Sequence, residues 1–159
     1  MFKISFLPAR FGDAIWIEYG SKRSPSRVLI DGGLSATYEA VIARAGNKYA
    51  LELMCVTHID QDHIEGAVKL LANLPSGMTL GEVWHNGYKH LVAEKRLGAA
   101  QAEKLQAAIE NYARAPWNAS FDGNAVVVPG KGELPEKTLP GALPNEAMIS
   151  FTGSSVSSP

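Results

Sequence analysis

The N-terminal part of the chain shows short apolar runs separated by glycine- and proline-bearing segments. Phe2–Leu7, Ala14–Tyr19 and Arg27–Ile30 are rich in β-branched and aromatic residues, and the first alternates between apolar and polar positions. This pattern predicts three strands that begin with a β-hairpin. The third run stops at Asp31-Gly32-Gly33, where two glycines allow a tight turn and let other groups approach the Asp31 carboxylate.

After this turn, segments with the apolar spacing of amphipathic helices alternate with compact apolar runs. Ser35 is a good N-cap residue, and Gly46-Asn47 is a typical stop signal for the helix that follows it. We expect a further helix over Ile64–Leu74, and one helix or a pair of helices broken near Gly98 over Val92–Arg114. Strands are expected over Leu51–Val56, Leu80–Trp84 and Ala125–Val128. The fold class is therefore α/β, with a mixed β-sheet, an early β-hairpin and flanking helices.

Composition supports one folded domain. The chain has 159 residues, 46% of them hydrophobic, which is enough for one sizeable core. Beyond Pro129 the sequence is rich in glycine, proline and serine. We therefore expect residues 1–128 to be folded, and residues 129–159 to be either a loop-rich, disordered tail or the truncated start of a second half of the fold.

Charge and cysteine content narrow the function classes. The formal net charge is −1, so the chain has no overall positive field of the kind that non-specific nucleic-acid binding uses. The single cysteine, Cys55, excludes an internal disulfide and is expected in the core. The N-terminus does not resemble a secretion signal, and no apolar run approaches the ~20 residues that a membrane helix needs. We therefore expect a cytoplasmic protein that does not associate with membranes.

The segment Thr57–Gly66 carries the candidate chemistry. It places His58, Asp60, Asp62 and His63 between a buried strand and an amphipathic helix. A strand end followed by a sharp loop can direct such side chains toward one point, and imidazole and carboxylate groups are ligands of zinc and related divalent ions. The alternative interpretation is an exposed polar loop without a ligand. A bound metal would activate water for hydrolysis.

This segment resembles the second motif of the metallo-β-lactamase superfamily, H-x-H-x-D-H, in a variant with Asp60 in place of the second histidine. The H-x-D-x-D-H form is similar to that of ComEC-type DNA-internalisation proteins. Gly12–Ile15 resembles the hairpin of that subgroup, Val28–Gly33 resembles motif one of the superfamily, and Val83–Gly87 also fits. The resemblance covers residues 1–128 and implies the N-terminal half of a metallo-β-lactamase-like domain, an αβ half-sandwich.

The resemblance also implies roles for individual residues. His58 and Asp60 match positions that hold one metal ion, while Asp62 and His63 match those that hold a second. Asp62 would in addition orient the nucleophilic water and so act in catalysis. Asp31 matches a residue that holds a ligand histidine in its tautomer. Zn²⁺ is the expected ion, with Mn²⁺ as the alternative because Asp60 is a harder ligand than histidine, and one or two ions would bind.

The chain departs from the superfamily in its remaining ligands. Members supply further histidine and aspartate ligands from a second αβ half, and no match to these is present. We expect His85 to be a surface residue or to support the ligands, and His90 to be exposed. Because half a sandwich would leave an apolar sheet face open, we expect a fragment of a longer protein, a homodimer, or a second chain that completes the fold.

Three function classes follow from these observations. The first is a metal-dependent hydrolase, by resemblance one that acts on a phosphoester such as a nucleic acid or nucleotide, with a thioester, lactam or lactone as open alternatives. The second is a catalytically incomplete half-domain that serves as an interaction module. The third, a nucleic-acid binder without chemistry, is disfavoured by the near-neutral charge. The metal motif favours the enzyme, and the missing ligands favour the half-domain.

Overall fold

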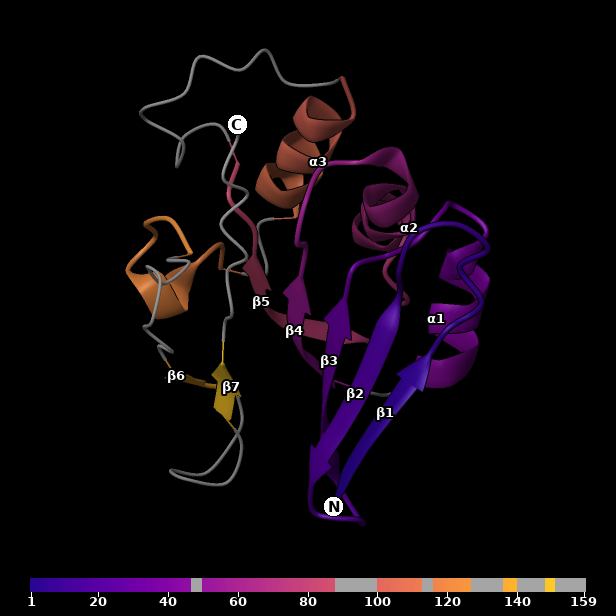
Figure 1. Cartoon of the computed structure of the whole chain (residues 1–159), viewed down its shortest axis with the longest axis vertical. Helices are drawn as coiled ribbons and strands as arrows, with labels where there is room; N and C mark the ends of the chain where they lie inside the picture. Colours follow the sequence, from indigo (N-terminus) through magenta and orange to yellow (C-terminus); the bar gives the residue numbers. More distant parts are fainter. Residues whose placement is uncertain (47–49, 88–99, 113–115, 127–135, 140–147, 151–159) are drawn as a thin grey trace, which may run out of the picture.

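A computed structural model describes residues 1–46, 50–87, 100–112, 116–126, 136–139 and 148–150 of the chain. Its centre is a five-stranded mixed sheet in the order β1-β2-β3-β4-β5 (Figure 1). The first three strands are antiparallel neighbours, and β3, β4 and β5 run parallel. The strands are β1 (Phe2–Phe6), β2 (Ile15–Gly20), β3 (Pro25–Ile30), β4 (Ala50–Cys55) and β5 (Thr79–Trp84). The predicted α/β class, early hairpin and mixed sheet are confirmed.

Three helices contribute to the core on one face of the sheet. They are α1 (Thr37–Ala45), α2 (Gln61–Ala72) and α3 (Ala100–Asn111). The core on this face joins Trp16 and Met54 of the sheet to Val41 of α1, Leu70 of α2 and Leu105 of α3, all at most 1% exposed. The apolar stripes that the sequence predicts on α1 and α2 thus face the sheet, as amphipathic helices do.

The opposite face of the sheet is covered over its central strands. Val28, Leu53 and Trp84 are fully buried there and form one cluster with Leu139, while Phe121 packs against it. Leu139 follows β6 (Glu136–Thr138), which pairs with β7 (Met148–Ser150). Our expectation that this sheet face stays open is therefore wrong for β2 to β5, because residues from the C-terminal part of the chain pack on it.

The edge strand β1 differs from the rest of the sheet. Phe2, Ile4 and Phe6 are 66%, 50% and 78% exposed, and their register partners in β2 are Tyr19, Ile17 and Ile15. Residues directly opposite in an antiparallel pair point to the same face. The three side chains, which we call the β1 stripe, therefore extend the second apolar face beyond its covered part.

Several element boundaries differ from the predictions. Helix α2 begins at Gln61 rather than Ile64, so it includes Asp62 and His63. Ser35 does not cap α1, because the N-cap residue of that helix is Ala36. The backbone N–H of Ser35 instead donates to Glu65 Oε2 of α2 at 3.2 Å. Ala125 and Val126 lie outside any strand, contrary to prediction.

Other predictions meet the limits of the described residues. Positions 127 and 128 of the predicted strand lie outside them, as do residues 92–99 of the predicted long helix and its break near Gly98. The pair β6–β7 falls within 129–159, where we expect loop, and the division of the chain at residue 128 stays a prediction.

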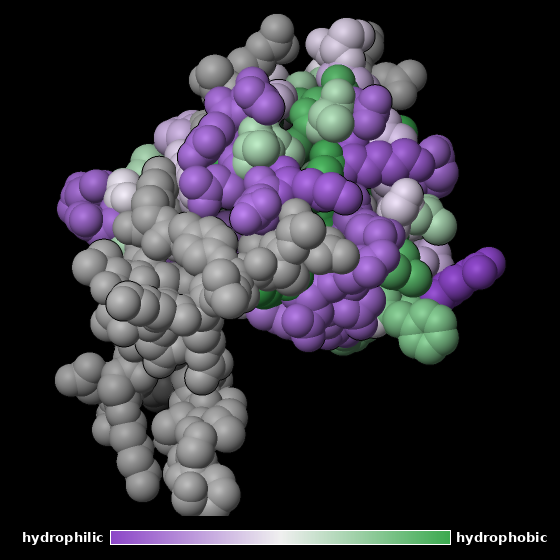
Figure 2. Space-filling view, turned by 90° about the horizontal axis from the view of Figure 1, so that it is seen from above, coloured by the Kyte–Doolittle hydropathy of each residue, from purple (hydrophilic) through white to green (hydrophobic). Residues whose placement is uncertain are grey.

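None of the helices in the described part of the chain has both the length and the apolar character needed to cross a membrane. Figure 2 views the molecule from above, at the end toward which β3 and β4 point in Figure 1, and hydrophilic residues dominate its described part. This is the edge that carries the candidate site.

Candidate metal centre

The ends of two parallel strands and the start of one helix meet at this edge. Strands β3 and β4 are neighbours, with Ile30 paired to Cys55, and the next residue, Asp31, donates its backbone N–H to the Cys55 carbonyl at 2.8 Å. The chain leaves β4 through Thr57 and His58 and enters α2 at Gln61. Parallel order therefore places Asp31 beside Thr57, as carboxyl ends of neighbouring parallel strands share one edge.

Two glycines let α2 approach the turn after β3. A Cβ on Gly66 would overlap the carbonyl oxygen of Gly32, and a Cβ on Gly32 would overlap the backbone nitrogen of Ala67. Two backbone hydrogen bonds join the segments, from Gly32 N–H to His63 O at 2.7 Å and from Gly66 N–H to Gly33 O at 2.9 Å. This close contact fixes the position of His63 relative to Asp31.

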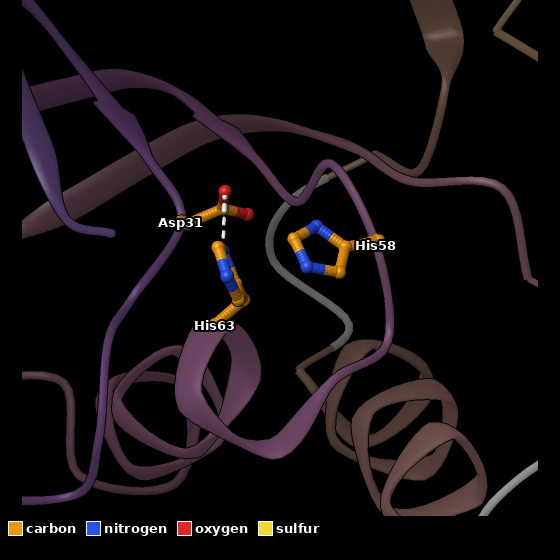
Figure 3. Close-up of side chains that lie close together, drawn as sticks. All are labelled: Asp31, His58 and His63. Carbon is orange, nitrogen blue, oxygen red and sulfur yellow. Dashed lines mark hydrogen bonds and ion pairs between the residues drawn. The ribbon is translucent and has the colours of Figure 1, made fainter. Parts of the chain in front are cut away.

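Asp31, His58 and His63 form the candidate metal centre. One potential ligand atom from each lies within 4.8 Å of the others, and no further group of this kind occurs among the residues that the structure describes. The ring centroids of His58 and His63 lie 3.7 Å apart, and the ring planes are tilted by 50° (Figure 3). His63 Nδ1 lies 3.1 Å from Asp31 Oδ2. The structure thus brings together three of the five residues that the sequence singles out.

Hydrogen bonds favour an orienting role for Asp31. Its Oδ1 accepts the backbone N–H of Thr57 at 2.8 Å, and its Oδ2 accepts the Thr57 hydroxyl at 2.6 Å. Its side chain is only 3% exposed, and the contact with His63 Nδ1 adds a third partner. A carboxylate accepts about four hydrogen bonds, so most of its capacity is used. These contacts favour the predicted orienting role over a place among the ligands.

Asp60 and Asp62 lie beside the histidines but outside the group of three. Asp60 Oδ2 is 3.7 Å from His58 Nε2, and Asp62 Oδ2 is 3.9 Å from His63 Nε2. Their side chains are 74% and 38% exposed. Asp60 occupies the N-cap position of α2 without a side-chain capping bond, so its carboxylate is not engaged in that role. Their predicted roles as ligands stay predictions.

The charge of Asp31 affects the core beneath it. Burial raises the pKa of the Cys55 thiol to about 12, and the nearby Asp31 carboxylate contributes to the same shift because it disfavours a second negative charge. Cys55 lies in the core, as the sequence predicts, and its raised pKa keeps the thiol protonated at neutral pH, so it is not suited to be a ligand or nucleophile.

His85 is not a surface residue, contrary to one of our two expectations. It is 3% exposed, and its Nδ1 lies 3.4 Å from the Val56 carbonyl oxygen. Asn118 accepts its backbone N–H at 2.9 Å and donates to its carbonyl oxygen at 3.0 Å. The burial follows from its place directly after the buried strand β5. His90 lies outside the described residues.

Sequence reasoning missed the part that Thr57 plays. Its hydroxyl contacts both Asp31 Oδ2 and His58 Nδ1, the latter at 2.9 Å. A hydroxyl residue between a buried strand and the first histidine of the motif was the available signal.

Comparisons with known proteins add little to this geometry. No protein-family model matches the sequence, and neither does any curated protein. The chain is similar to a solved structure of a "putative metallo-beta-lactamase" from Thermotoga maritima, with 20% identity and a TM-score of 0.38. The match covers 84% of this chain and 58% of that one, so the chain spans little more than half of that protein's length. A TM-score of this size does not establish a shared fold.

Proposed function

We propose that this chain is a metal-dependent hydrolase of the metallo-β-lactamase superfamily. The observation that carries the proposal is the convergence of His58 and His63 with Asp31 at one sheet edge, with potential ligand atoms within 4.8 Å. The motif resemblance of Thr57–Gly66 supplies the superfamily.

The donor set fits a divalent cation of the zinc type. Nδ1 of His63 lies against Asp31, and Nδ1 of His58 lies against Thr57, which leaves Nε2 of each ring for a cation. Histidine ligands in metal sites commonly make such a hydrogen bond through their other nitrogen. Asp60 and Asp62, with carboxylate oxygens within 4 Å of the two Nε2 atoms, would complete the ligand set. A cation held there would polarise a substrate oxygen and lower the pKa of a water to about 7.

The residues of the chain would divide the work as follows. His58 and His63 would bind the cation, and Asp31 would hold the His63 ring in place. Asp62 would orient the attacking water, which is the catalytic role that the motif resemblance implies for it, and we propose that its carboxylate also accepts the proton of that water. The metal is Zn²⁺, with Mn²⁺ as the alternative.

A phosphoester is the proposed substrate class, and the resemblance to ComEC-type proteins is its main support. A hollow of about 310 Å³ runs along α2, and its lining includes Gln61, Glu65, Lys69 and Lys104. Because Lys69 Nζ also lies 3.6 Å from Glu39, the charges around the hollow balance and give no second argument for an anionic substrate.

The experiment is a hydrolysis assay with bis-p-nitrophenyl phosphate and added Zn²⁺ or Mn²⁺. We expect metal-dependent activity that falls at least about 100-fold in Asp62→Asn, because the proton acceptor is lost. Asp122→Asn, in a turn outside the site, is the matched control and should retain full activity. Equal activity of Asp62→Asn and the parent chain would refute the assigned role, and no activity with either metal would refute a hydrolase that is complete in this chain.

A second candidate is an interaction module that keeps the metal site without catalysis. The exposed β1 stripe favours it, because apolar patches of this kind mark protein contacts. A homodimer or a second chain would cover the stripe, and we propose either as the partner. Self-association without hydrolysis would favour this candidate, and hydrolysis by the isolated chain would exclude it.

A further inference from the structure

Thr57 connects the buried carboxylate to the more exposed of the two histidines. His58 has a side chain 44% exposed, against 11% for His63, and has no direct contact with Asp31 among the hydrogen bonds of the described residues. Its Nδ1 instead lies 2.9 Å from Thr57 Oγ1, which lies 2.6 Å from Asp31 Oδ2. The three groups therefore form a chain from the sheet core to the exposed ring (Figure 3 shows Asp31, His58 and His63).

The direction of each hydrogen bond in this chain follows from its chemistry. An ionised carboxylate only accepts, and a hydroxyl has one proton to donate. The Thr57 proton therefore goes to Asp31 Oδ2, and the remaining lone pairs of Oγ1 can only accept. His58 Nδ1 must then carry the donated proton, which leaves the lone pair of the neutral ring on Nε2.

We propose that Thr57 is a positioning residue. Its hydroxyl, held by Asp31, accepts a hydrogen bond from His58 Nδ1 and so fixes the tautomer of that ring, an arrangement that we call the relay. Asp31 acts on His63 directly and on His58 through the Thr57 hydroxyl, so that Nε2 of each ring keeps its lone pair for a ligand. The purpose assigned to this relay rests on the proposed function, because it prepares both rings for one cation.

The simpler alternative is that Thr57 only anchors Asp31 and the end of β4. Two substitutions separate these roles. Thr57→Val keeps the shape of the side chain and the backbone N–H that Asp31 Oδ1 accepts, but removes the hydroxyl. Thr57→Ser keeps the hydroxyl and removes only a methyl group. If Thr57 only anchors Asp31 through its backbone N–H, the tautomer of His58 should be the same in both variants.

The primary experiment is ¹⁵N NMR of the imidazole nitrogens in the metal-free protein at pH 8. We expect His58 to be protonated at Nδ1 in the parent chain and in Thr57→Ser, and to become a mixture of tautomers in Thr57→Val. A parent chain in which His58 carries its proton on Nε2 would overturn the relay, and this test needs no variant. An unchanged tautomer in Thr57→Val would overturn it as well.

Zinc affinity, measured by competition with a chromophoric chelator, is the second readout. Loss of a group that orients a ligand typically weakens binding 10–100-fold. We expect a loss of this size in Thr57→Val and a change below about threefold in Thr57→Ser, while equal losses in both variants would contradict the relay. If the parent chain binds no zinc, the proposed function fails, and the tautomer measurement still decides the relay.

Discussion

The candidate metal centre and the β1 stripe lie on the same sheet and differ in whether their side chains have partners within the chain. At the metal centre, Asp31 is 2% exposed and its carboxylate contacts Thr57 and His63. In the stripe, Phe2 and Phe6 are 66% and 78% exposed although they continue an apolar face. The chain therefore supplies the orienting network of its histidines from its own residues but leaves part of its hydrophobic surface in contact with solvent. Chemistry and assembly can thus be tested separately.

The largest expected effect comes from disrupting the close backbone contact between α2 and the turn after β3, which positions the metal centre. Gly66→Ala would force its methyl group into the Gly32 carbonyl, and overpacking against backbone should cost about 3 kcal/mol or more of unfolding free energy. Gly20→Ala is the control, because it meets nothing within 4 Å and has only its positive φ of 85° as strain, worth about 1–2 kcal/mol. Urea denaturation measures both, and equal costs would show that the contact between the turn and α2 is not close.

A smaller effect, on zinc affinity, is expected from a substitution of the Asp31 carboxylate alone. Asp31→Asn keeps the shape of the side chain but replaces one accepting oxygen with a donor, so it cannot satisfy both the Thr57 and His63 contacts. Zinc affinity should fall about 10–100-fold. Asp122→Asn, the control, should bind as the parent does. A zinc affinity of Asp31→Asn within threefold of that of the parent chain would show that Asp31 does not orient a ligand.

The β1 stripe can be tested without touching the metal centre. Phe2→Ser with Phe6→Ser should lower self-association in sedimentation velocity, while zinc affinity stays unchanged. Stability should change by less than about 1 kcal/mol because these side chains are exposed. Lys3→Ser, on the other face of the same strand, is the control and should associate as the parent does. A monomeric parent chain would instead leave a different partner protein as the occupant of the stripe.

A further effect, confined to alkaline pH, involves no residue of the metal centre or the β1 stripe. Burial raises the pKa of Cys55 from 9.0 to about 12 and that of Tyr19 from 10.0 to about 12. A raised pKa means that the folded state holds the proton more tightly, so stability is full below pH 9 and falls as pH rises from 9 toward 12. Each group contributes a slope of at most about 1.4 kcal/mol per pH unit.

Cys55→Ala should reduce this slope, measured by urea denaturation between pH 9 and 11. Tyr19 keeps its own contribution in that variant and so provides an internal reference. An identical slope in both proteins would show that the thiol does not titrate differently on folding.

The sequence predicted the sheet and the metal motif because both have local signals. The apolar runs at Leu51–Val56 and Leu80–Trp84 match β4 and β5 within one residue at each end. The turn at Asp31-Gly32-Gly33 was predicted to bring groups near the carboxylate, and His63 and Thr57 are those groups. Local spacing was sufficient in these places.

Other features depend on contacts between distant segments and left no local signal. His85 is buried because it follows a core strand and contacts Asn118, 33 residues later in the chain. The second sheet face is covered partly by Leu139, from a segment whose composition predicted loop. Ser35 looked like a cap, but its backbone N–H donates to Glu65 of another helix. Tertiary contacts decided each of these cases.

The most direct test of the central claim is the zinc stoichiometry and affinity of the purified chain, measured by calorimetry. We expect at least one ion bound per chain. Binding should be lost in His58→Ala plus His63→Ala but retained in Glu103→Gln, which removes an exposed carboxylate of α3. Zinc binding of equal affinity in the double variant and the parent chain would contradict a metal centre built on these two histidines.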